Sequence, residues 1–339
     1  MDEALFLDLF ENGPFDGPVE SRKWLETYIS RLIFSNKHVY KFKKPLRYSF
    51  VDFSTLELRR HFCTVELKLN SRLANQVYLD VLPVGLSQGS WHIGQETGDD
   101  TIDYCVWMNR MDENKLMDRL LTGKEVDQTQ IKILALKVAG FHQSCQTVDL
   151  DPEKYIQTQL IDFDDIENEI PIIERFLGVN WVARIKSAIE SVHCFIDTHS
   201  DLFRQRLSNG FVRDLHGDLH SGNIFLYSDP IIFDCLEFDD HLRQIDVLNE
   251  VAFMCMDLEY REFFKFSKIF LKTYLSLSGS DFSSLEQNMF HFFKAYRANV
   301  KAKINALRLV SYSICPPEQE VMQVRKYLLL MDHYISHIR

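Results

Sequence analysis

The character of the sequence changes near residue 114, and this change limits the folds that the chain can adopt. Three runs rich in β-branched and aromatic residues precede it, at 27–43, 77–86 and 101–111. Nearly every segment after it has the spacing of apolar residues that is typical of helices. We therefore predict an α+β protein with two lobes, a small one at 1–108 built on a β-sheet and a larger, mostly helical one at 109–339.

Local patterns place the elements of the smaller lobe. A helical stretch should end near Gly13, and two strands should meet in a hairpin at 35–37. Ser54 is a candidate N-cap, with a glutamate three residues later and leucines at helical spacing beyond it, which predicts a helix over 54–74. The polar segment 87–100 is predicted to be a turn between two further strands.

The larger lobe is expected to contain one β insertion among its helices. The insertion falls at 211–238, where β-branched and aromatic residues interrupt the helical spacing. Helices are predicted at 115–122, 128–146, 153–177, 180–207, 244–277 with breaks, and 283–310.

Charge and cysteine usage disfavour several classes of protein. The 339 residues include 49 acidic and 38 basic ones, and the net charge of -11 disfavours nucleic acid as a partner. The seven cysteines are scattered and never spaced C-x-x-C, so neither a disulfide framework nor a thiolate zinc site is expected. No apolar run reaches 18 residues, and the acidic segment 1–15 lacks the pattern of a signal peptide, so we expect neither a membrane span nor a leader. We expect a cytoplasmic protein that binds neither nucleic acid nor membranes.

Residues 215–226, LHGDLHSGNIFL, hold the densest group of reactive side chains. His216, Asp218 and His220 alternate, so on a strand all three would face one side, as metal ligands do. A zinc site of this kind needs further histidine or carboxylate ligands, and the other histidines form no paired motif. The metal cage is therefore disfavoured. A tight turn capped by Asp218 and Asn223 is a second interpretation.

A third interpretation is a catalytic loop of the form H-x-D-x-x-x-x-N. In phosphoryl transfer an aspartate orients the substrate hydroxyl, and an asparagine a few residues later can offer its oxygen to Mg²⁺. Asp218 and Asn223 have this spacing, and a further carboxylate, Asp234, ends the apolar run in PIIFDCLEFDD. Strands at 223–226 and 231–233 would form a hairpin that brings Asn223 and Asp234 together.

The two stretches HGDLHSGNIFL and IIFDCLEFDD together resemble the catalytic and metal-binding loops of the aminoglycoside phosphotransferase-like kinase family. VYKFKKPLRYSFVDFSTLELRRHFCTVELKLNSRLA and YRANVKAKINALR resemble a bacterial subfamily of uncharacterised enzymes of that family, so the similarity covers most of 20–310. The resemblance implies the bilobal protein-kinase-like fold. It also implies an enzyme that uses ATP or GTP and Mg²⁺.

The resemblance assigns roles to the loop residues by position. Asp218 would be the catalytic base or the residue that orients the acceptor hydroxyl. Asn223 and Asp234 would hold Mg²⁺. His216 would be a structural member of the catalytic loop, and Asp246, at the start of a later helix, would accept hydrogen bonds from the backbone amides of that loop. An ordinary helix N-cap is the alternative for Asp246.

The same resemblance assigns a phosphate-binding lysine. In VYKFKK this lysine is Lys41, with Lys43 as its rival because both face the same side of a strand. Glu66 would be the helix glutamate that pairs with the lysine and fixes its charge beside the phosphates. Each of these residues also has an ordinary interpretation as a solvated surface charge.

Other parts of the nucleotide site are less sharply defined. The hinge whose backbone bonds the adenine edge would lie at 106–110 and include Val106 and Met108. The strand before the lysine has no Gly-rich loop, so phosphate contacts there would come from backbone amides and from Thr27 or Ser30. A Cys-Leu pair follows the metal aspartate, where protein kinases have Phe-Gly, and this argues against control by an activation loop.

The nature of the acceptor stays open at this stage. Arg297 and Lys301 share one face of a helix, and this basic face is either solvated or receives an anionic acceptor. A cationic acceptor would instead need an acidic cleft, for which Glu237 and Asp239 are candidates.

We predict that the protein transfers the γ-phosphoryl group of a nucleotide to a hydroxyl of a small molecule. A protein Ser/Thr kinase is the main alternative among enzymes. A nucleotide-binding pseudokinase or interaction module is the alternative from another class, which would bind nucleotide without turnover.

Overall fold

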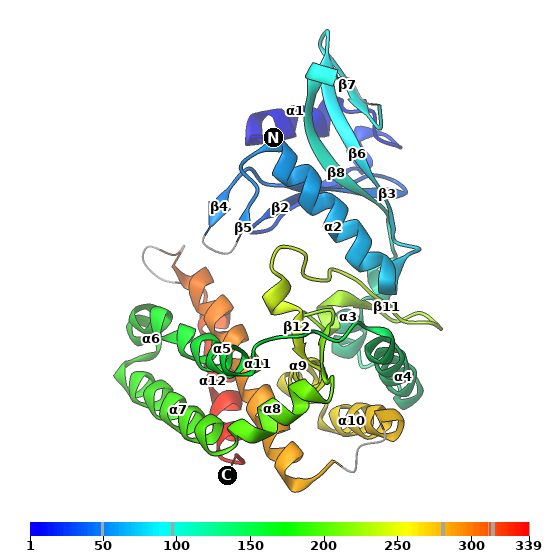
Figure 1. Ribbon diagram of the computed structural model, residues 1–339. Helices are drawn as coiled ribbons and strands as arrows, with labels where there is room; N and C mark the ends of the chain where they lie inside the picture. The colour runs from blue at the N-terminus through cyan, green and yellow to red at the C-terminus, as the bar shows by residue number, and fades with distance from the viewer. Residues whose placement is uncertain (49–50, 96–97, 279–281, 311, 313–315, 339) are drawn as a thin grey trace. The chain divides into compact units, whose positions relative to one another are not determined.

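The computed structural model describes residues 1–48, 51–95, 98–278, 282–310, 312 and 316–338. The chain forms two compact units. The first is made of Met1–Gly123 and Gly222–Leu242, and the second of Lys124–Ser221 and Arg243–Arg339. Figure 1 labels most of the helices and strands of both units.

A six-stranded antiparallel sheet with the order β1-β2-β3-β8-β6-β7 forms the core of the first unit. Its strands are β1 (Lys23–Glu26), β2 (Ser30–Phe34), β3 (His38–Lys43), β6 (Tyr78–Ser87), β7 (Ser90–Ile93) and β8 (Thr101–Asn109). The short strands β4 (Arg47–Tyr48) and β5 (Val51–Asp52) form a separate pair. The predicted hairpin at 35–37 is the β2–β3 connection.

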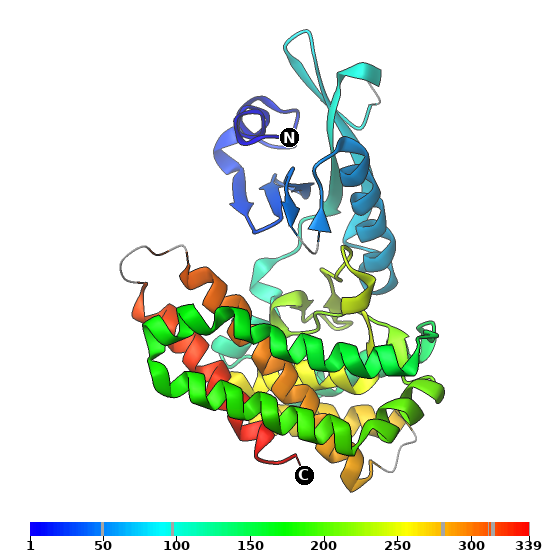
Figure 2. The same cartoon turned by 60° about the vertical axis from the view of Figure 1, so that its left-hand side comes forward.

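Two helices pack on opposite faces of this sheet (Figure 2). Helix α1 (Glu3–Asn12) covers one face through Phe6 and Leu9, which pack with Tyr40 and Phe42 of β3. Helix α2 (Leu56–Ala74) packs on the other face. Because side chains alternate along a strand, the neighbours of Tyr40 and Phe42 in β3 point toward α2.

Three details of the first unit differ from the predictions. The N-cap of α2 is Thr55 and not Ser54, because the hydroxyl of Thr55 accepts the amide of Leu58 at 3.2 Å. The segment 87–100 is not a simple turn, since it contains the edge strand β7. The exposed edge strand β1 was also not predicted, because its four residues show no buried face.

The predicted hairpin after the catalytic-loop motif is confirmed. Strands β10 (Ile224–Phe225) and β11 (Ile231–Ile232) pair antiparallel, with Ile224 opposite Ile232. The single-turn helices η3 (Glu113–Lys115) and η5 (Ser221–Asn223) and the helix α3 (Met117–Thr122) lie near it in the chain. Phe225 also bridges to Leu116, so the hairpin is anchored to the end of the first segment of its unit.

The second unit is a helical assembly with one small β pair. Its helices are α4 (Gln128–Ser144), α5 (Pro152–Asp164), α6 (Ile170–Leu177), α7 (Val179–Thr198), α8 (Ser200–Ser208), α9 (Val247–Tyr260), α10 (Phe264–Ser278), α11 (Ser284–Leu309) and α12 (Glu318–Ile335). Strands β9 (Val212–Asp214) and β12 (Gln244–Asp246) pair antiparallel. The stretch predicted as one helix with breaks at 244–277 therefore begins with a strand.

Helix α9 is the most buried element of the second unit. Residues 247–258 are all buried, which fits a helix that is apolar on every side. Three polar residues, Asn249, Glu250 and Asp257, are buried with them. Such groups are costly to bury without partners, so their contacts point to what the helix supports.

The described helices include none that is both long and apolar enough to cross a membrane. The six described cysteines are all free thiols, and Cys315 lies outside the described residues. The predicted α+β class, with an N-terminal antiparallel sheet and a larger helical part, is confirmed.

Candidate active site

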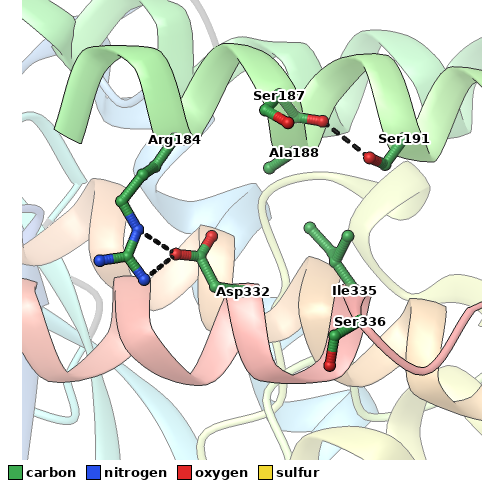
Figure 3. Close-up of a pocket in the computed structure, with 7 residues that line it drawn as sticks. All are labelled: Arg184, Ser187, Ala188, Ser191, Asp332, Ile335 and Ser336. Carbon is green, nitrogen blue, oxygen red and sulfur yellow. Dashed lines mark hydrogen bonds and ion pairs between the residues drawn. The ribbon is translucent and has the colours of Figure 1, made fainter. Parts of the chain in front are cut away.

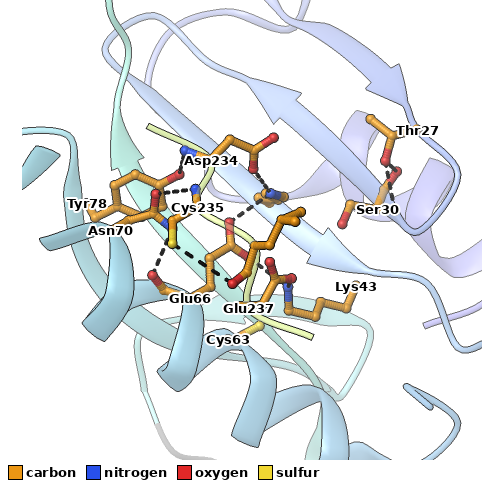
Figure 4. Close-up of polar contacts among 12 residues, drawn as sticks. Thr27, Ser30, Lys43, Cys63, Glu66, Asn70, Tyr78, Asp234, Cys235 and Glu237 are labelled. Atoms are coloured by element: carbon orange, nitrogen blue, oxygen red, sulfur yellow. Dashed lines mark hydrogen bonds and ion pairs between the residues drawn. The ribbon is translucent and has the colours of Figure 1, made fainter. Parts of the chain in front are cut away.

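Strand β3 directs Lys41 and Lys43 at Glu66 of helix α2. Figure 4 labels Lys43 and Glu66 of this group. Lys41 Nζ donates to Glu66 Oε1 at 2.8 Å and to Asp234 Oδ1 at 2.7 Å. Lys43 Nζ donates to Glu66 Oε2 at 2.6 Å and also pairs with Glu237. The structure therefore brings Lys41, Glu66 and Asp234 together in the first unit, as the roles inferred from the resemblance require.

These contacts keep Glu66 ionised although it is fully buried. Burial by itself would raise the pKa of Glu66, but the charges of Lys41 and Lys43 outweigh it and lower this pKa to about 2. Burial would likewise lower the pKa of Lys41, but Asp234 and Glu66 raise it well above its usual value. The group is thus a charged network, and Lys41 is its more exposed lysine, at 12% against 0% for Lys43.

The backbone around Asp234 is held in an unusual conformation. Asp234 has φ +63°, a region that few residues other than glycine adopt and in which aspartate is enriched. Its amide donates to the hydroxyl of Tyr78 at 3.2 Å, and the amide of Cys235 donates to Asn70 Oδ1 at 2.9 Å. Tyr78 and Asn70 thereby fix the segment against β6 and α2.

Asn223 and Asp234 lie at the matching ends of the β10–β11 hairpin. The amide of Phe233 donates to the carbonyl of Asn223 at 3.0 Å, which places Asn223 beside the residue that precedes Asp234. The carboxylate of Asp234 is 45% exposed, and its Oδ2 has no partner among the described residues. An exposed carboxylate oxygen beside an asparagine fits the oxygen ligands that Mg²⁺ prefers.

The described residues contain no group of three or more His, Cys, Asp or Glu side chains that could hold a metal ion. The histidine cage considered from the sequence is therefore not formed. Mg²⁺ on a nucleotide does not need such a group, since one or two protein oxygens and the phosphates complete its shell.

The catalytic-loop motif in the second unit is held by helix α9. Glu250 Oε1 accepts the amides of His216 and Gly217 at 2.9 and 2.7 Å. Glu250 Oε2 lies 2.8 Å from Nε2 of His142, which comes from α4. Gly217 has φ +87°, so the chain turns sharply just before Asp218.

A buried arginine holds the same turn from helix α11. Arg297 Nη1 donates to the carbonyl of Gly217 at 3.1 Å, and its Nε donates to Asn249 Oδ1 at 2.6 Å. Its guanidinium also lies 4.6 Å from the ring centre of Phe253. The amides and the carbonyl of this turn are thus fixed by α9 and α11.

Asp218 lies between the side chains of His220 and Lys301. Nε2 of His220 is 3.3 Å from one carboxylate oxygen and Nζ of Lys301 is 3.9 Å from the other. Burial would raise the pKa of Asp218, but His220 and Lys301 outweigh it and hold this pKa well below its usual range. The carboxylate is 28% exposed and ionised at neutral pH, which suits a residue that accepts a hydrogen bond from a hydroxyl.

The expected contacts of one of the two loop-supporting residues, Asp246, need correction. Asp246 does not accept the amides of the loop, because Glu250 does. Asp246 instead caps α9 by accepting the amide of Leu248 and pairs with Arg206. His216 is buried in the loop, as expected, and its Nδ1 accepts the amide of Asp218 at 3.3 Å.

The expected substrate residues are less available than the sequence indicated. Arg297 is 6% exposed and is engaged by the loop, so neither the solvated face nor a direct substrate role fits it. Glu237 is buried against Lys43 and is not part of an open acidic cleft. Asp239 accepts the amide of His241 at 2.9 Å. Lys301 is the partly exposed residue of the predicted basic face.

The expected hinge also needs correction. Val106 lies opposite Lys41 on one side and Val81 on the other, and Met108 lies opposite Val39 and Tyr78. Both residues are thus inside a strand with neighbours on both sides, and their backbone is not open to a ligand. The amides of the next residues, 109 and 110, donate to carbonyls at the same end of the sheet. A hinge would have to begin after them.

The first residue of β2 carries an unsatisfied hydroxyl. Thr27 Oγ1 accepts the amide of Ser30 at 3.0 Å, so it is used within the turn. Ser30 Oγ is fully buried and has no hydrogen-bond partner among the described residues. Ser30 lies opposite Lys43 in the β2–β3 ladder. Of the two residues considered for phosphate contacts, Ser30 is thus the one with an unused hydroxyl.

Comparison with known proteins connects this geometry to a fold. No family model matches the sequence. Uncharacterised proteins of Mycobacterium tuberculosis and Mycobacterium bovis are 29% identical over 320 residues, which cover 92% of this chain and 59% of theirs. The chain thus spans about three fifths of the length of these curated relatives.

Solved structures of small-molecule kinases resemble the chain over nearly its whole length. A choline/ethanolamine kinase family protein of Mesorhizobium loti has a TM-score of 0.50 at 10% identity, with 94% of both chains covered. The GDP complex of aminoglycoside 2'-phosphotransferase-IIIa has a TM-score of 0.50 at 13% identity, with 99% of both chains covered. The chain has their protein-kinase-like fold. Choline kinase of Cryptosporidium parvum has a TM-score of 0.50 at 10% identity, over 99% of this chain and 94% of its own.

Several residues of this kinase-like fold were not found from the sequence. Glu250 and Asp257 were predicted only as members of a helical stretch, and their contacts with the loop were not predicted. Asp257, for example, accepts the amide of Ser221 at 3.0 Å. Asn70 and Tyr78, which hold the Asp234 segment, were also not predicted to belong to the site. The available signal was the presence of charged residues within the otherwise apolar run VLNEVAFMCMDLEY.

A separate cavity of about 260 Å³ lies in the second unit between α7 and α12 (Figure 3). Arg184 and Asp332 form an ion pair at one end of it, at 2.5 Å. Its lining residues are Arg184, Ser187, Ala188, Ser191, Asp332, Ile335 and Ser336. They include none of the predicted site residues.

Proposed function

We propose that the protein is a phosphotransferase that moves the γ-phosphoryl group of ATP or GTP to a hydroxyl of a small molecule. The observation that carries the proposal is the contact of Lys41 with both Glu66 and Asp234. A lysine fixed between a helix glutamate and an exposed carboxylate in the left-handed backbone region is what a nucleotide phosphate site with a metal aspartate requires.

The residues of the first unit would bind the nucleotide. Lys41 would contact the phosphates as a point charge, and Glu66 would keep it in place. Asn223 and Asp234 would hold Mg²⁺, which supplies charge neutralisation at the phosphates when it is bound. Asp234 is ready for this role because one of its oxygens is exposed and unused among the described residues.

The second unit would provide the group that positions the acceptor. Asp218 would accept a hydrogen bond from the acceptor hydroxyl and align it for attack. His220 and Lys301 keep Asp218 ionised at neutral pH. Lys301 and Asp239 remain candidates for contacts with the rest of the acceptor. A location of the protein in the cytoplasm would agree with the use of a nucleotide.

The solved structures that share the fold support a small acceptor. They include kinases of choline and ethanolamine and an aminoglycoside phosphotransferase, one of them as a GDP complex. A protein acceptor finds no comparable support here, since the segment after Asp234 is pinned by buried contacts.

The test is a screen of a metabolite pool for phosphorylation that needs both nucleotide and Mg²⁺, with the Asp218→Asn protein as control. We expect the wild type to phosphorylate at least one pool compound, and the variant to lose orders of magnitude in kcat while it still binds nucleotide. Nucleotide binding without any turnover would favour a pseudokinase. Equal turnover by the two proteins would show that Asp218 does not align the acceptor hydroxyl.

A further inference from the structure

A second lysine and a second glutamate lie next to the proposed phosphate site, and the reaction as proposed leaves both without a role. Lys43 is 0% exposed and the side chain of Glu237 is 4% exposed. Their ion pair is buried, and Lys43 Nζ reaches Glu66 as well. Neither residue can contact a nucleotide from this position.

A buried ion pair is a costly way to stabilise a fold. Apolar side chains of similar size are often as stable or more stable in such a place, whereas the removal of one partner alone is strongly destabilising. The specific geometry of the pair is therefore more informative than its contribution to stability. That geometry concerns Glu66 and the segment that carries Asp234.

Lys43 fixes the half of the Glu66 carboxylate that Lys41 does not use. Oε1 of Glu66 faces Lys41 and Oε2 faces Lys43. With both oxygens engaged, the carboxylate cannot rotate without breaking a contact on each side. Without Lys43, Glu66 would hold Lys41 through one oxygen only.

Glu237 extends this link to the metal-binding segment. It follows Asp234 by three residues, and Lys43 therefore joins β3 to that segment. Lys41 now contacts Asp234 directly, but a nucleotide phosphate and Mg²⁺ would compete for these two groups. When Lys41 turns to a phosphate, its own link to the segment weakens, while the Lys43–Glu237 link stays.

We propose that Lys43 and Glu237 are positioning residues that hold Glu66 toward Lys41 and hold Asp234 in place for Mg²⁺ while nucleotide is bound. The inference rests on the proposed function and deepens it. The metal aspartate and the lysine–glutamate pair are then locked by one buried clamp, so that the nucleotide site is assembled before any ligand arrives.

The test compares Lys43→Met, Glu237→Gln and the double variant Lys43→Met/Glu237→Gln with the wild type. Lys44→Met is the matched control, because Lys44 follows Lys43 directly but pairs with the surface residue Glu26 at 2.9 Å. Calorimetry measures the affinity for ATP with and without Mg²⁺, and thermal unfolding measures stability. Once an acceptor is found, its KM and kcat are measured as well.

We expect the single variants to lose about 10–100-fold in Mg²⁺-dependent nucleotide affinity, as is usual for residues that orient metal ligands. The concentration of Mg²⁺ needed for half-maximal binding should rise, and the KM of the acceptor should stay unchanged. Lys44→Met should bind like the wild type. The double variant removes both charges, so it is the safer protein to fold, and it should show the same raised Mg²⁺ requirement.

Two results would overturn the inference. One is a lower unfolding temperature of the single variants with unchanged nucleotide affinity and Mg²⁺ requirement. The other is a double variant that binds Mg²⁺ and ATP like the wild type, which would mean that the pair only balances charge. If the wild type itself does not bind ATP with Mg²⁺, the proposed function fails, and this outcome is visible before any variant is made.

Discussion

Asp218 shows how much the chemistry of one residue depends on its neighbours. Its carboxylate faces Lys301 from α11 and His220 from its own loop, and both stabilise the ionised form. Two residues upstream the chain is fixed by Glu250, so the carboxylate is oriented as well as charged. A carboxylate that is already ionised can accept a hydrogen bond from a hydroxyl without first losing a proton.

Replacement of Lys301 tests this electrostatic argument. In Lys301→Met one of the charges that depress the pKa of Asp218 is removed, so this pKa should rise. The acidic limb of the kcat profile should therefore move to higher pH than in the wild type. The measurement is kcat against pH with the acceptor found by the screen, and an unmoved limb would show that Lys301 does not act on Asp218.

The lysines of β3 show what could be predicted at this scale. Alternation along a strand correctly placed Lys41 and Lys43 on one face, and the resemblance paired Lys41 with Glu66. The role of Glu237 could not be predicted, because its partner lies 194 residues away in the sequence. Spacing shows which residues share a face of an element, but it does not show which distant charge meets them.

At the scale of elements, helix α9 is the support of the catalytic loop. Glu250 accepts two loop amides, Asp257 accepts the amide of Ser221, and Asn249 holds Arg297. These polar groups lie within an otherwise apolar and buried helix. Their hydrogen bonds offset the cost of burial.

Glu250→Ala should destabilise the protein by about 3–5 kcal/mol, because it leaves two buried loop amides without their acceptor and removes the carboxylate from Nε2 of His142. Urea denaturation measures the change in the free energy of unfolding. Glu262→Ala is the control, since Glu262 is exposed and pairs only with Lys326 on the surface, and it should change this energy by less than about 0.5 kcal/mol. Similar values for the two variants would contradict the role given to Glu250.

Helix α1 completes the sheet core on the face away from the lysines. Phe6 is 1% exposed, and its ring packs edge-on against Phe42 at 5.9 Å between ring centres. Phe6→Ala should therefore cost about 3–5 kcal/mol of unfolding free energy. Leu7→Ala, at a neighbouring position that is 38% exposed, is the matched control and should cost much less. Equal losses in a denaturant titration would show that α1 does not pack as described.

Helix α11 shows why the basic face was misjudged. Its 26 residues run through the second unit, and the stretch 292–299 is buried throughout. Helical spacing correctly predicted that Arg297 and Lys301 lie on one side of the helix, but it does not predict whether that side faces solvent. The middle of this helix is packed on several sides, so Arg297 does not face solvent and contacts the loop instead.

At the scale of the whole molecule, the class and order of the elements could be predicted and the division of the chain only in outline. The change from strands to helices and the β10–β11 hairpin follow from local patterns. Each compact unit, however, is built from two segments of the chain, and the late segment 222–242 belongs to the first unit. Local sequence patterns do not predict that a later segment of the chain packs with an earlier unit. The division into lobes at 1–108 and 109–339 stays a prediction.

Two histidines with lowered pKa values, His291 and His333, make the stability of the protein depend on pH. The ring of His337 lies 5.1 Å from that of His291 and 4.7 Å from that of His333, measured between ring centres. Burial, together with Lys294 and the neighbouring rings, lowers the pKa of His291 from 6.5 to about 4 and also lowers the pKa of His333. Glu259 opposes this only weakly.

Stability should therefore fall on acidification. The unfolded chain takes up a proton at His291 near pH 6.5, whereas the folded chain does not until about pH 4, so the folded state is fully favoured above pH 6.5 and loses stability below it. Urea denaturation at pH 7 and pH 5 measures the loss. His291→Phe should lose less over this interval, and an identical loss in both proteins would contradict the account.

The most direct test of the central claim is the binding of ATP measured by calorimetry with and without Mg²⁺, in the wild type and in Asp234→Asn. Asp234 would hold the metal and now contacts Lys41 at 2.7 Å. We predict that Mg²⁺ strengthens ATP binding by the wild type and that the variant loses most of this dependence while it still folds. If the wild type does not bind ATP, or if both proteins respond equally to Mg²⁺, the assignment of the site is wrong.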